Sequence, residues 1–212
     1  MTPFRNRAAA GRELASRLAA DARNREAMVL ALPRGGVPVG YEIARALEIP
    51  MDVVLVRKLG VPGREELAMG AVATGGAFFI DQWMVDRLSI SRAQVEEVID
   101  RERAELSRRE REYRDDRAPP DIRSMTVICV DDGLATGASM RAAVAAVREG
   151  RPARVVIAVP VAAPEIADAL RNVADDVVVA RLTKNLRAVS AWYEDFSQTT
   201  DKEVRELLAR SR

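Results

Sequence analysis

The segment 127–139, VICVDDGLATGAS, combines residue types that suit a sugar phosphate. An apolar stretch ends in two adjacent carboxylates, Asp131 and Asp132, and a loop with glycines and hydroxyls then leads into a predicted helix. Backbone N–H groups at a helix start are unpaired donors at the positive end of the dipole, so they bind phosphate well. The two carboxylates would repel a bare phosphate, but they can accept hydrogen bonds from sugar hydroxyls or act near a divalent cation.

Two common nucleotide-binding motifs do not explain this segment. A Walker A motif needs GxxxxGK[ST], and no lysine lies between Gly133 and Ser139. The other glycine loop reads GGVPVG over residues 35–40, so the dinucleotide-binding GxGxxG pattern is absent. The chain also contains no histidine, which excludes Ser-His-Asp and Cys-His catalysis and zinc sites that need imidazole.

Composition narrows the class of protein further. The chain has 33 basic and 32 acidic residues, a net charge of +1, so bulk electrostatics give no reason to expect nucleic acid as a partner. The single cysteine, Cys129, lies within the apolar run 127–130 and is expected to be a core thiol. No apolar run of about 18 residues suggests a membrane span. Residues 1–12 have no apolar signal-peptide centre, so we expect a cytoplasmic protein without a membrane partner.

Alternation of strand-like and helix-like patterns predicts an α/β fold. Continuous rather than alternating apolar residues in the strands indicate a mainly parallel sheet that helices cover on both faces. The predicted strands are 28–32, 51–57, 125–130, 154–161 and 176–180. The predicted helices are 8–20, 37–47, 139–148, 164–172 and 201–210, the last with Thr200 as its N-cap and Glu203 at the third position.

The middle of the chain differs in kind. Residues 58–68 contain two glycines, a proline and several charges and are interpreted as a long mobile loop, and residues 69–80 as a hairpin that turns at Gly75-Gly76. We therefore divide the chain into an α/β core, residues 1–80 and 121–212, and a helical hood, residues 81–120, which the N- or C-terminal helix could join.

The hood contains a highly charged stretch with two explanations. From Arg101 to Arg117 there are seven arginines and six acids, with i, i+4 pairs at 105/109 and 110/114. A surface helix with ion pairs explains this pattern, and its narrow apolar stripe would be Val95, Ile99, Leu106 and Tyr113. A lid or a partner-binding appendage explains it as well.

Two motifs resemble those of a known enzyme family. VICVDDGLATGAS resembles the phosphoribosyl-pyrophosphate (PRPP) signature of type I phosphoribosyltransferases, and LPRGG at 32–36 is similar to the pyrophosphate loop of the xanthine and hypoxanthine-guanine enzymes. The motifs lie about 100 residues apart in the order that the family uses. The resemblance covers residues 25–80 and 121–185, and it implies an α/β fold with a mainly parallel sheet flanked by helices and a small helical hood.

The resemblance also implies roles for individual residues. Asp131 and Asp132 would hold the ribose hydroxyls, face the positive charge that develops on the sugar, and contact Mg²⁺ through substrate or water. The 5-phosphate would lie in the loop formed by Gly133, Leu134, Ala135, Thr136, Gly137, Ala138 and Ser139. Arg34, Gly35 and Gly36 would meet the pyrophosphate, with the Arg34–Gly35 bond as a non-proline cis peptide. Mg²⁺ would arrive with the substrate.

One position departs from part of the family. Many hypoxanthine-guanine enzymes have an aspartate where this chain has Ala135, and that aspartate is a candidate for proton handling on the base. Adenine enzymes are similar to this chain in having alanine there. The general acid/base is therefore unassigned, and specificity for hypoxanthine or guanine is less secure than the fold.

Arg57 and Lys58 end a predicted strand and begin the predicted mobile loop. They are explained either as an ordinary basic strand end or as cations aimed at pyrophosphate, with loop 58–68 closing over the site to exclude water. Glu65 and Glu66 in the same loop fit a solvated tip better than a proton relay.

Aromatic residues gather near the C-terminus, where Trp192, Tyr193 and Phe196 fall within five positions. They are explained either by stacking on a nucleobase or by docking of the C-terminal segment onto the sheet. Asp195 could bind a base edge, but nothing in the sequence fixes its direction.

These observations predict a phosphoribosyltransferase that takes PRPP and a nitrogenous base, a purine or related heterocycle, and releases pyrophosphate. A catalytically silent PRPP- or nucleotide-binding regulatory protein with the same fold is the alternative. The absence of a Walker lysine and of histidine argues against a pyrophosphate- or nucleotide-hydrolysing enzyme. The sequence leaves the oligomeric state open, a homodimer included.

Overall fold

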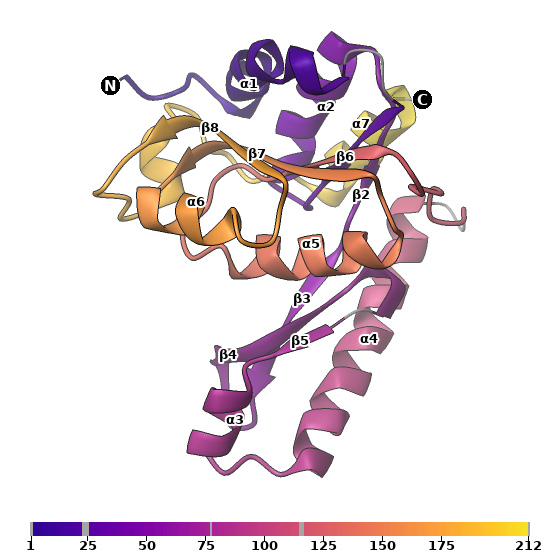
Figure 1. The fold of residues 1–212 in the computed structure, drawn as a ribbon, viewed down its shortest axis with the longest axis vertical. Helices are drawn as coiled ribbons and strands as arrows, with labels where there is room; N and C mark the ends of the chain where they lie inside the picture. Colours follow the sequence, from indigo (N-terminus) through magenta and orange to yellow (C-terminus); the bar gives the residue numbers. More distant parts are fainter. Residues whose placement is uncertain (1, 23–25, 77, 115–116, 212) are drawn as a thin grey trace.

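A five-stranded parallel sheet forms the centre of the molecule (Figure 1), in the strand order β2-β1-β6-β7-β8. The computed structural model describes residues 2–22, 26–76, 78–114 and 117–211. The strands are β1 (Ala27–Ala31), β2 (Met51–Val53), β6 (Thr126–Val130), β7 (Arg154–Ala162) and β8 (Asp176–Leu182). Every residue of β1 and β6 is buried, as the continuous apolar runs predicted.

Helices cover both faces of this sheet, which confirms the predicted fold class (Figure 1). One face carries α1 (Arg7–Ala22), α2 (Gly36–Leu47) and α7 (Asp201–Arg210), and the other carries α5 (Ala138–Glu149) and α6 (Pro164–Leu170). Alternate residues of β6 enter the two cores, so Ile128 packs with α1 and α2, whereas Cys129 packs with α5 and α6. Cys129 is a core thiol as predicted, and burial raises its pKa to about 12.

The predicted strand 51–57 divides between two sheets. β2 ends at Val53, and β3 (Val56–Val61) begins a separate antiparallel sheet of three strands. The chain passes from one sheet to the other at the two residues between them. The N–H of Val54 still donates to Ala31 in the main sheet, whereas the N–H of Leu55 donates to the Thr74 hydroxyl. The apolar pattern is continuous through this point, so the change of sheet leaves no mark on the sequence.

The prediction of a mobile loop over 58–68 is wrong. β3 and β4 (Arg64–Ala73) pair in an antiparallel hairpin that turns at Pro62-Gly63, where Gly63 has a φ of 73°. Its buried residues, Leu59, Val61 and Met69, hold the hairpin in the core despite the charges around them.

The second predicted hairpin, over 69–80, is confirmed. β4 pairs with β5 (Phe78–Ile80) through the short 3-10 helix η1 (Thr74–Gly76), with positive φ at Gly75 and Gly76. Glycine is suited to both positions because it carries no Cβ to penalise this backbone conformation.

The described part of the predicted hood contains two helices, α3 (Gln82–Arg87) and α4 (Arg92–Arg114). Together with β3, β4 and β5 they form an extension that projects beyond α5 (Figure 1). The hood was predicted from helices alone, whereas in space the antiparallel sheet lies with them. None of the helices in the described ranges is long and apolar enough to cross a membrane.

Helix α4 has one face for solvent and one for the core. The expected pair Glu105–Arg109 forms at 2.8 Å between half-buried side chains. Of the expected stripe, Ile99, Leu106 and Tyr113 are buried. Arg114, whose side chain is only 4% exposed, pairs with Asp52 at 3.2 Å and donates to the carbonyl of Val53 at 2.7 Å. The end of α4 is therefore attached to β2, and the helix is not only a solvated appendage.

We expect Arg114→Ala to lower the free energy of unfolding by about 2–4 kcal/mol, because it leaves the Asp52 carboxylate and the Val53 carbonyl without their partner. Arg108→Ala on the outer face of the same helix should change stability little. Denaturant unfolding of both variants measures the contrast, and equal effects would mean that α4 is held by its apolar stripe alone.

Candidate functional site

The two signature loops lie side by side because the strands that precede them are neighbours. β1 and β6 pair in parallel with Ala31 opposite Val130, and the N–H of Leu32 continues the pairing by donating to Val130 at 2.8 Å. Residues 33–36 and 131–137 therefore leave the same edge of the sheet. Open parallel sheets bind ligands at this edge, beyond the carboxyl ends of the strands.

Gly35 and Gly36 allow the first loop to touch the acids of the second. A Cβ on Gly35 would lie 2.0 Å from Oδ2 of Asp132, and one on Gly36 would lie 2.6 Å from the carbonyl oxygen of Val130. Gly35 has an ordinary φ of −63°, so its close contact requires glycine and its backbone conformation does not. The contact explains why two motifs about 100 residues apart form one site.

The second loop is fixed at both ends and open between them. Leu134 is buried and its N–H donates to Val161 at the end of β7, so it anchors the loop and its N–H is not free for a phosphate. Gly137, with a φ of 73°, starts α5. The exposed residues are Ala135, Thr136 and Ala138, with Gly133 and Ser139 half-buried beside them. Residues 133–139 therefore lie together at the start of α5, and the N–H of Leu134 is bound within the protein.

Burial makes the charged forms of Asp131 and Asp132 unfavourable. The Asp132 side chain is 16% exposed, and the Asp131 carboxylate accepts the backbone N–H of Asp132 at 2.8 Å. Burial and then repulsion from Asp132 hold the pKa of Asp131 well above its usual range. Burial also raises the pKa of Asp132, while an ion pair with Arg7 opposes that rise.

Arg7, the first residue of α1, is a site residue that the sequence did not suggest. Its Nε donates to Oδ2 of Asp132 at 2.8 Å, its Nη1 donates to the carbonyl of Ser197 at 2.7 Å, and its guanidinium lies 3.8 Å from the centre of the Phe196 ring. Arg7 and Asp132 are 125 residues apart, so no local pattern could have paired them.

Tyr193 is enclosed, which supports docking of the C-terminal segment and corrects the base-stacking role considered for this residue. Its ring lies between those of Phe4 and Phe196, at 5.6 and 5.0 Å between ring centres, and only 6% of the residue is exposed. Its hydroxyl donates to the backbone carbonyl of Asp132 at 2.6 Å, and burial raises its pKa. Trp192 is partly buried, and its carbonyl accepts the N–H of Phe4.

Neighbouring structure explains the positions of Asp195, Glu65 and Glu66 without a role in binding or proton transfer. The Asp195 carboxylate accepts the backbone N–H of Ser197 at 2.9 Å, and this bond lowers its pKa. Glu65 and Glu66 are exposed on β4, as a solvated segment requires.

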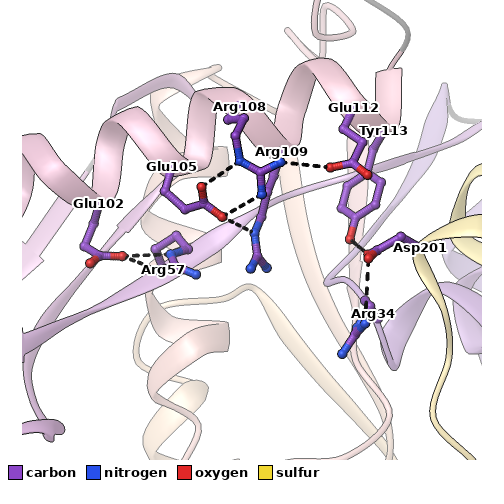
Figure 2. A network of polar contacts seen from close by, with 9 residues as sticks. All are labelled: Arg34, Arg57, Glu102, Glu105, Arg108, Arg109, Glu112, Tyr113 and Asp201. Carbon is purple, nitrogen blue, oxygen red and sulfur yellow. Dashed lines mark hydrogen bonds and ion pairs between the residues drawn. The ribbon is translucent and has the colours of Figure 1, made fainter.

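Arg34 projects from the first loop toward α7 (Figure 2). Its Nη1 lies 3.8 Å from Oδ2 of Asp201, and the other oxygen of that carboxylate accepts the hydroxyl of Tyr113 on α4. Burial, followed by the bond to Asp201, raises the pKa of Tyr113. The non-proline cis peptide is the Pro33–Arg34 bond, so the expectation of a cis bond at Arg34–Gly35 is wrong by one residue.

Arg57 is engaged elsewhere. It donates to Glu102 on α4 at 2.8 and 2.5 Å (Figure 2). Glu102 and Tyr113 are eleven positions apart on one helix, a rise of roughly 16 Å, so α4 contacts the Arg57 and Arg34 networks at well-separated points. Lys58 follows Arg57 on β3 and is exposed. The structure thus places the loop that carries Arg34 against Asp132, while the Arg57 side chain is held by Glu102 on α4.

The donor set fits a divalent cation that arrives with its substrate. Across the described ranges, no group of three or more Asp, Glu, Cys or His residues is arranged to hold a metal ion. Asp131 and Asp132 alone supply too few oxygens for Mg²⁺, which commonly keeps several waters and takes its remaining ligands from substrate phosphates.

Comparison with known proteins identifies the family. The model for the phosphoribosyl transferase domain matches residues 2–190, so the chain belongs to this family. Residues 191–212, which include Tyr193, Ser197 and Asp201, lie outside that match.

Individual relatives agree with this assignment. A crystal structure of the protein TT1426 from Thermus thermophilus is 41% identical and covers 99% of both chains, with a TM-score of 0.85. Two proteins from strains of Mycobacterium tuberculosis, which carry the provisional name phosphoribosyl transferase, are 38% identical over 211 residues. These residues are all but one of this chain and 47% of each relative, so the chain spans about half the length of these relatives.

We expect Gly35→Ala to displace the Asp132 carboxylate, since its Cβ would overlap Oδ2. Overpacking of this kind costs about 1–3 kcal/mol of stability, and PRPP binding should fall with it. Gly63→Ala is the control, because nothing lies within 4 Å of its Cβ and only backbone strain is added. Calorimetric titration with PRPP distinguishes the variants, and unimpaired binding in Gly35→Ala would contradict the contact.

We expect Asp131→Asn to raise the midpoint of thermal unfolding of the ligand-free protein by a few degrees near neutral pH. Because the folded-state pKa of Asp131 is raised, its charged form costs stability above that pKa, and the cost disappears when pH falls below the unfolded-state value. The gain should therefore shrink as pH is lowered. Asp132→Asn should gain less, because it also removes the ion pair with Arg7. A lower midpoint in Asp131→Asn at neutral pH would refute the account.

Proposed function

We propose that this protein transfers the ribose 5-phosphate of PRPP to a nitrogenous base, a purine or related heterocycle, and releases pyrophosphate. The observation that carries the proposal is the contact between Gly35 and Asp132. It joins the pyrophosphate loop to the sugar-binding acids at one edge of the sheet, as a substrate that has both groups requires.

Asp131 and Asp132 accept hydrogen bonds from the ribose hydroxyls in this proposal. The same carboxylates lie beside the carbon that becomes positively charged as pyrophosphate leaves. Their low exposure strengthens the electrostatic stabilisation of an oxocarbenium-like sugar, because fewer waters screen it. The negative charge of Asp131 and Asp132, which lowers the stability of the ligand-free protein, thus stabilises the cationic sugar in the proposed reaction.

The start of α5 receives the 5-phosphate. Gly137 lets the backbone turn into the helix, and Thr136 and Ser139 supply hydroxyls next to it. A phosphate at this point also gains from the positive end of the helix dipole.

Arg34, Gly35 and Gly36 bind the pyrophosphate. The Arg34 side chain is 38% exposed, and its separation of 3.8 Å from Asp201 leaves its donors available to a ligand. Mg²⁺ would supply charge neutralisation to the leaving pyrophosphate, with Asp131 and Asp132 holding it through substrate or water. The general acid/base for the acceptor is unassigned, since the methyl group of Ala135 can neither donate nor accept a proton.

The second candidate is a regulatory protein that binds PRPP or a nucleotide without turnover, which the same loops would support. Ala135 provides no general acid or base for the acceptor. If transfer to the base requires such a group, its absence favours a protein that binds the ligand without turnover. A homodimer and a cytoplasmic location stay predictions from the sequence.

Thermal unfolding with and without PRPP and Mg²⁺ tests ligand binding. A ligand at about 100 times its dissociation constant adds roughly 2.7 kcal/mol. At about 2–4 °C per kcal/mol, the midpoint should rise by roughly 5–11 °C in the wild type. The rise should disappear in Asp132→Asn.

Release of pyrophosphate across a panel of bases then separates the two candidates. Turnover with any base, lost in Asp132→Asn, establishes the transferase. A thermal shift without turnover for any base favours the regulatory protein. No shift with PRPP overturns the transferase and leaves only a regulatory protein that binds a nucleotide, which a shift with nucleotides in place of PRPP would test.

A further inference from the structure

The guanidinium of Arg7 is fixed on three sides. Asp132 accepts from its Nε, the carbonyl of Ser197 accepts from its Nη1, and the Phe196 ring covers its face. Only 11% of the Arg7 side chain is exposed. An arginine held in this way has already lost its rotamer freedom, so it can hold another group without a further entropic cost.

Arg7 and Gly35 act on the same oxygen of Asp132. Arg7 binds Oδ2 at 2.8 Å, and the missing side chain of Gly35 leaves room for that oxygen and no more. The backbone of Asp132 is fixed as well, because the hydroxyl of Tyr193 donates to its carbonyl. A carboxylate has about four acceptor sites, so Oδ1 still has capacity for a ligand hydroxyl while Oδ2 is held.

We propose that Arg7 is the positioning residue of the sugar site, which holds the Asp132 carboxylate in the orientation that accepts a ribose hydroxyl. The proposal rests on the function proposed above and extends it to a residue outside both signature loops. Arg7 acts through Asp132.

The support for Arg7 comes from a part of the chain that the family match does not include. That match ends at residue 190, whereas Phe196 and Ser197 hold the guanidinium. The arrangement is therefore a property of how the two ends of this chain meet. The N–H of Phe4 donates to Trp192 at 2.8 Å, and the N–H of Glu194 donates back to Phe4 at 2.8 Å, which joins the ends next to Arg7.

The test compares Arg7→Gln and Arg7→Lys with Arg17→Gln, a matched change on the same helix. Arg17 is 43% exposed and pairs with Glu13 at the protein surface. Calorimetry with three probes, PRPP, ribose 5-phosphate and inorganic pyrophosphate, each with Mg²⁺, separates the sugar site from the pyrophosphate loop. Steady-state measurements of pyrophosphate release show whether each variant changes KM for PRPP or kcat.

Arg7→Gln should weaken PRPP and ribose 5-phosphate roughly 10- to 100-fold, the usual effect of one lost charged hydrogen bond, and raise KM for PRPP accordingly. Its affinity for inorganic pyrophosphate should fall clearly less than its affinity for ribose 5-phosphate, since the proposed contact of pyrophosphate with Asp132 runs only through Mg²⁺ or water. Arg7→Lys should recover part of the loss because it restores the charge without the planar guanidinium. Arg17→Gln should match the wild type for all three probes.

Two outcomes overturn this inference while the proposed function stands. In one, Arg7→Gln binds PRPP as the wild type does. In the other, it loses affinity equally for pyrophosphate and for ribose 5-phosphate, which indicates general damage to the fold. A wild-type protein that binds none of the three probes overturns the proposed function, and this inference with it.

Discussion

The site depends on one electrostatic constraint, the placement of two adjacent carboxylates at the edge of a buried parallel sheet. Asp131 and Asp132 leave β6 where little water reaches them, so their charges need compensation from the protein. Arg7 supplies the opposite charge, and the absence of a side chain at Gly35 lets the neighbouring loop approach. Tyr193 holds the backbone of Asp132 from the far end of the chain. In the proposed reaction, these two charges are already in place before the sugar becomes cationic, so the protein need not reorganise to stabilise it.

A second charge network makes α4 more than a surface helix. Its outer face carries exposed pairs such as Arg92–Glu96, which add little stability. Its inner face reaches Arg57 through Glu102 and Arg34 through Tyr113 and Asp201 (Figure 2). The charged segment that looks uniform in sequence therefore has two functions, solvation on one side and attachment of basic residues of the core and extension on the other. Net charge cannot distinguish them, because the stretch from Arg101 to Arg117 holds seven arginines and six acids in all.

The sequence predicts the helices and strands whose formation depends on local residue patterns. Apolar runs located β1 and β6, helical spacing located α1, α2 and α5, and Thr200 was recognised as the N-cap of α7. The sequence failed where a choice depends on distant partners. The run 51–57 divides between sheets because Val54 donates to β1, whereas Leu55 donates to the hydroxyl of Thr74 next to β4. Residues 58–68 form strands because their few apolar residues are buried. Arg7 was missed for the same reason, since its partners are 125 and 190 residues away.

The same contrast between local and distant partners separates the features that this chain shares with its family from those outside the two loops. The loops that resemble the family come from two neighbouring strands, so any chain with that sheet can form them. What surrounds them here comes from elsewhere, from the N-terminal Arg7, from residues 193–201 beyond the family match, and from an extension of three strands and two helices. In the proposed function the loops bind PRPP, and Arg7 holds the Asp132 carboxylate from outside them. The general acid/base for the acceptor is unassigned because of Ala135, so the groups that select the acceptor must be sought in those surrounding segments.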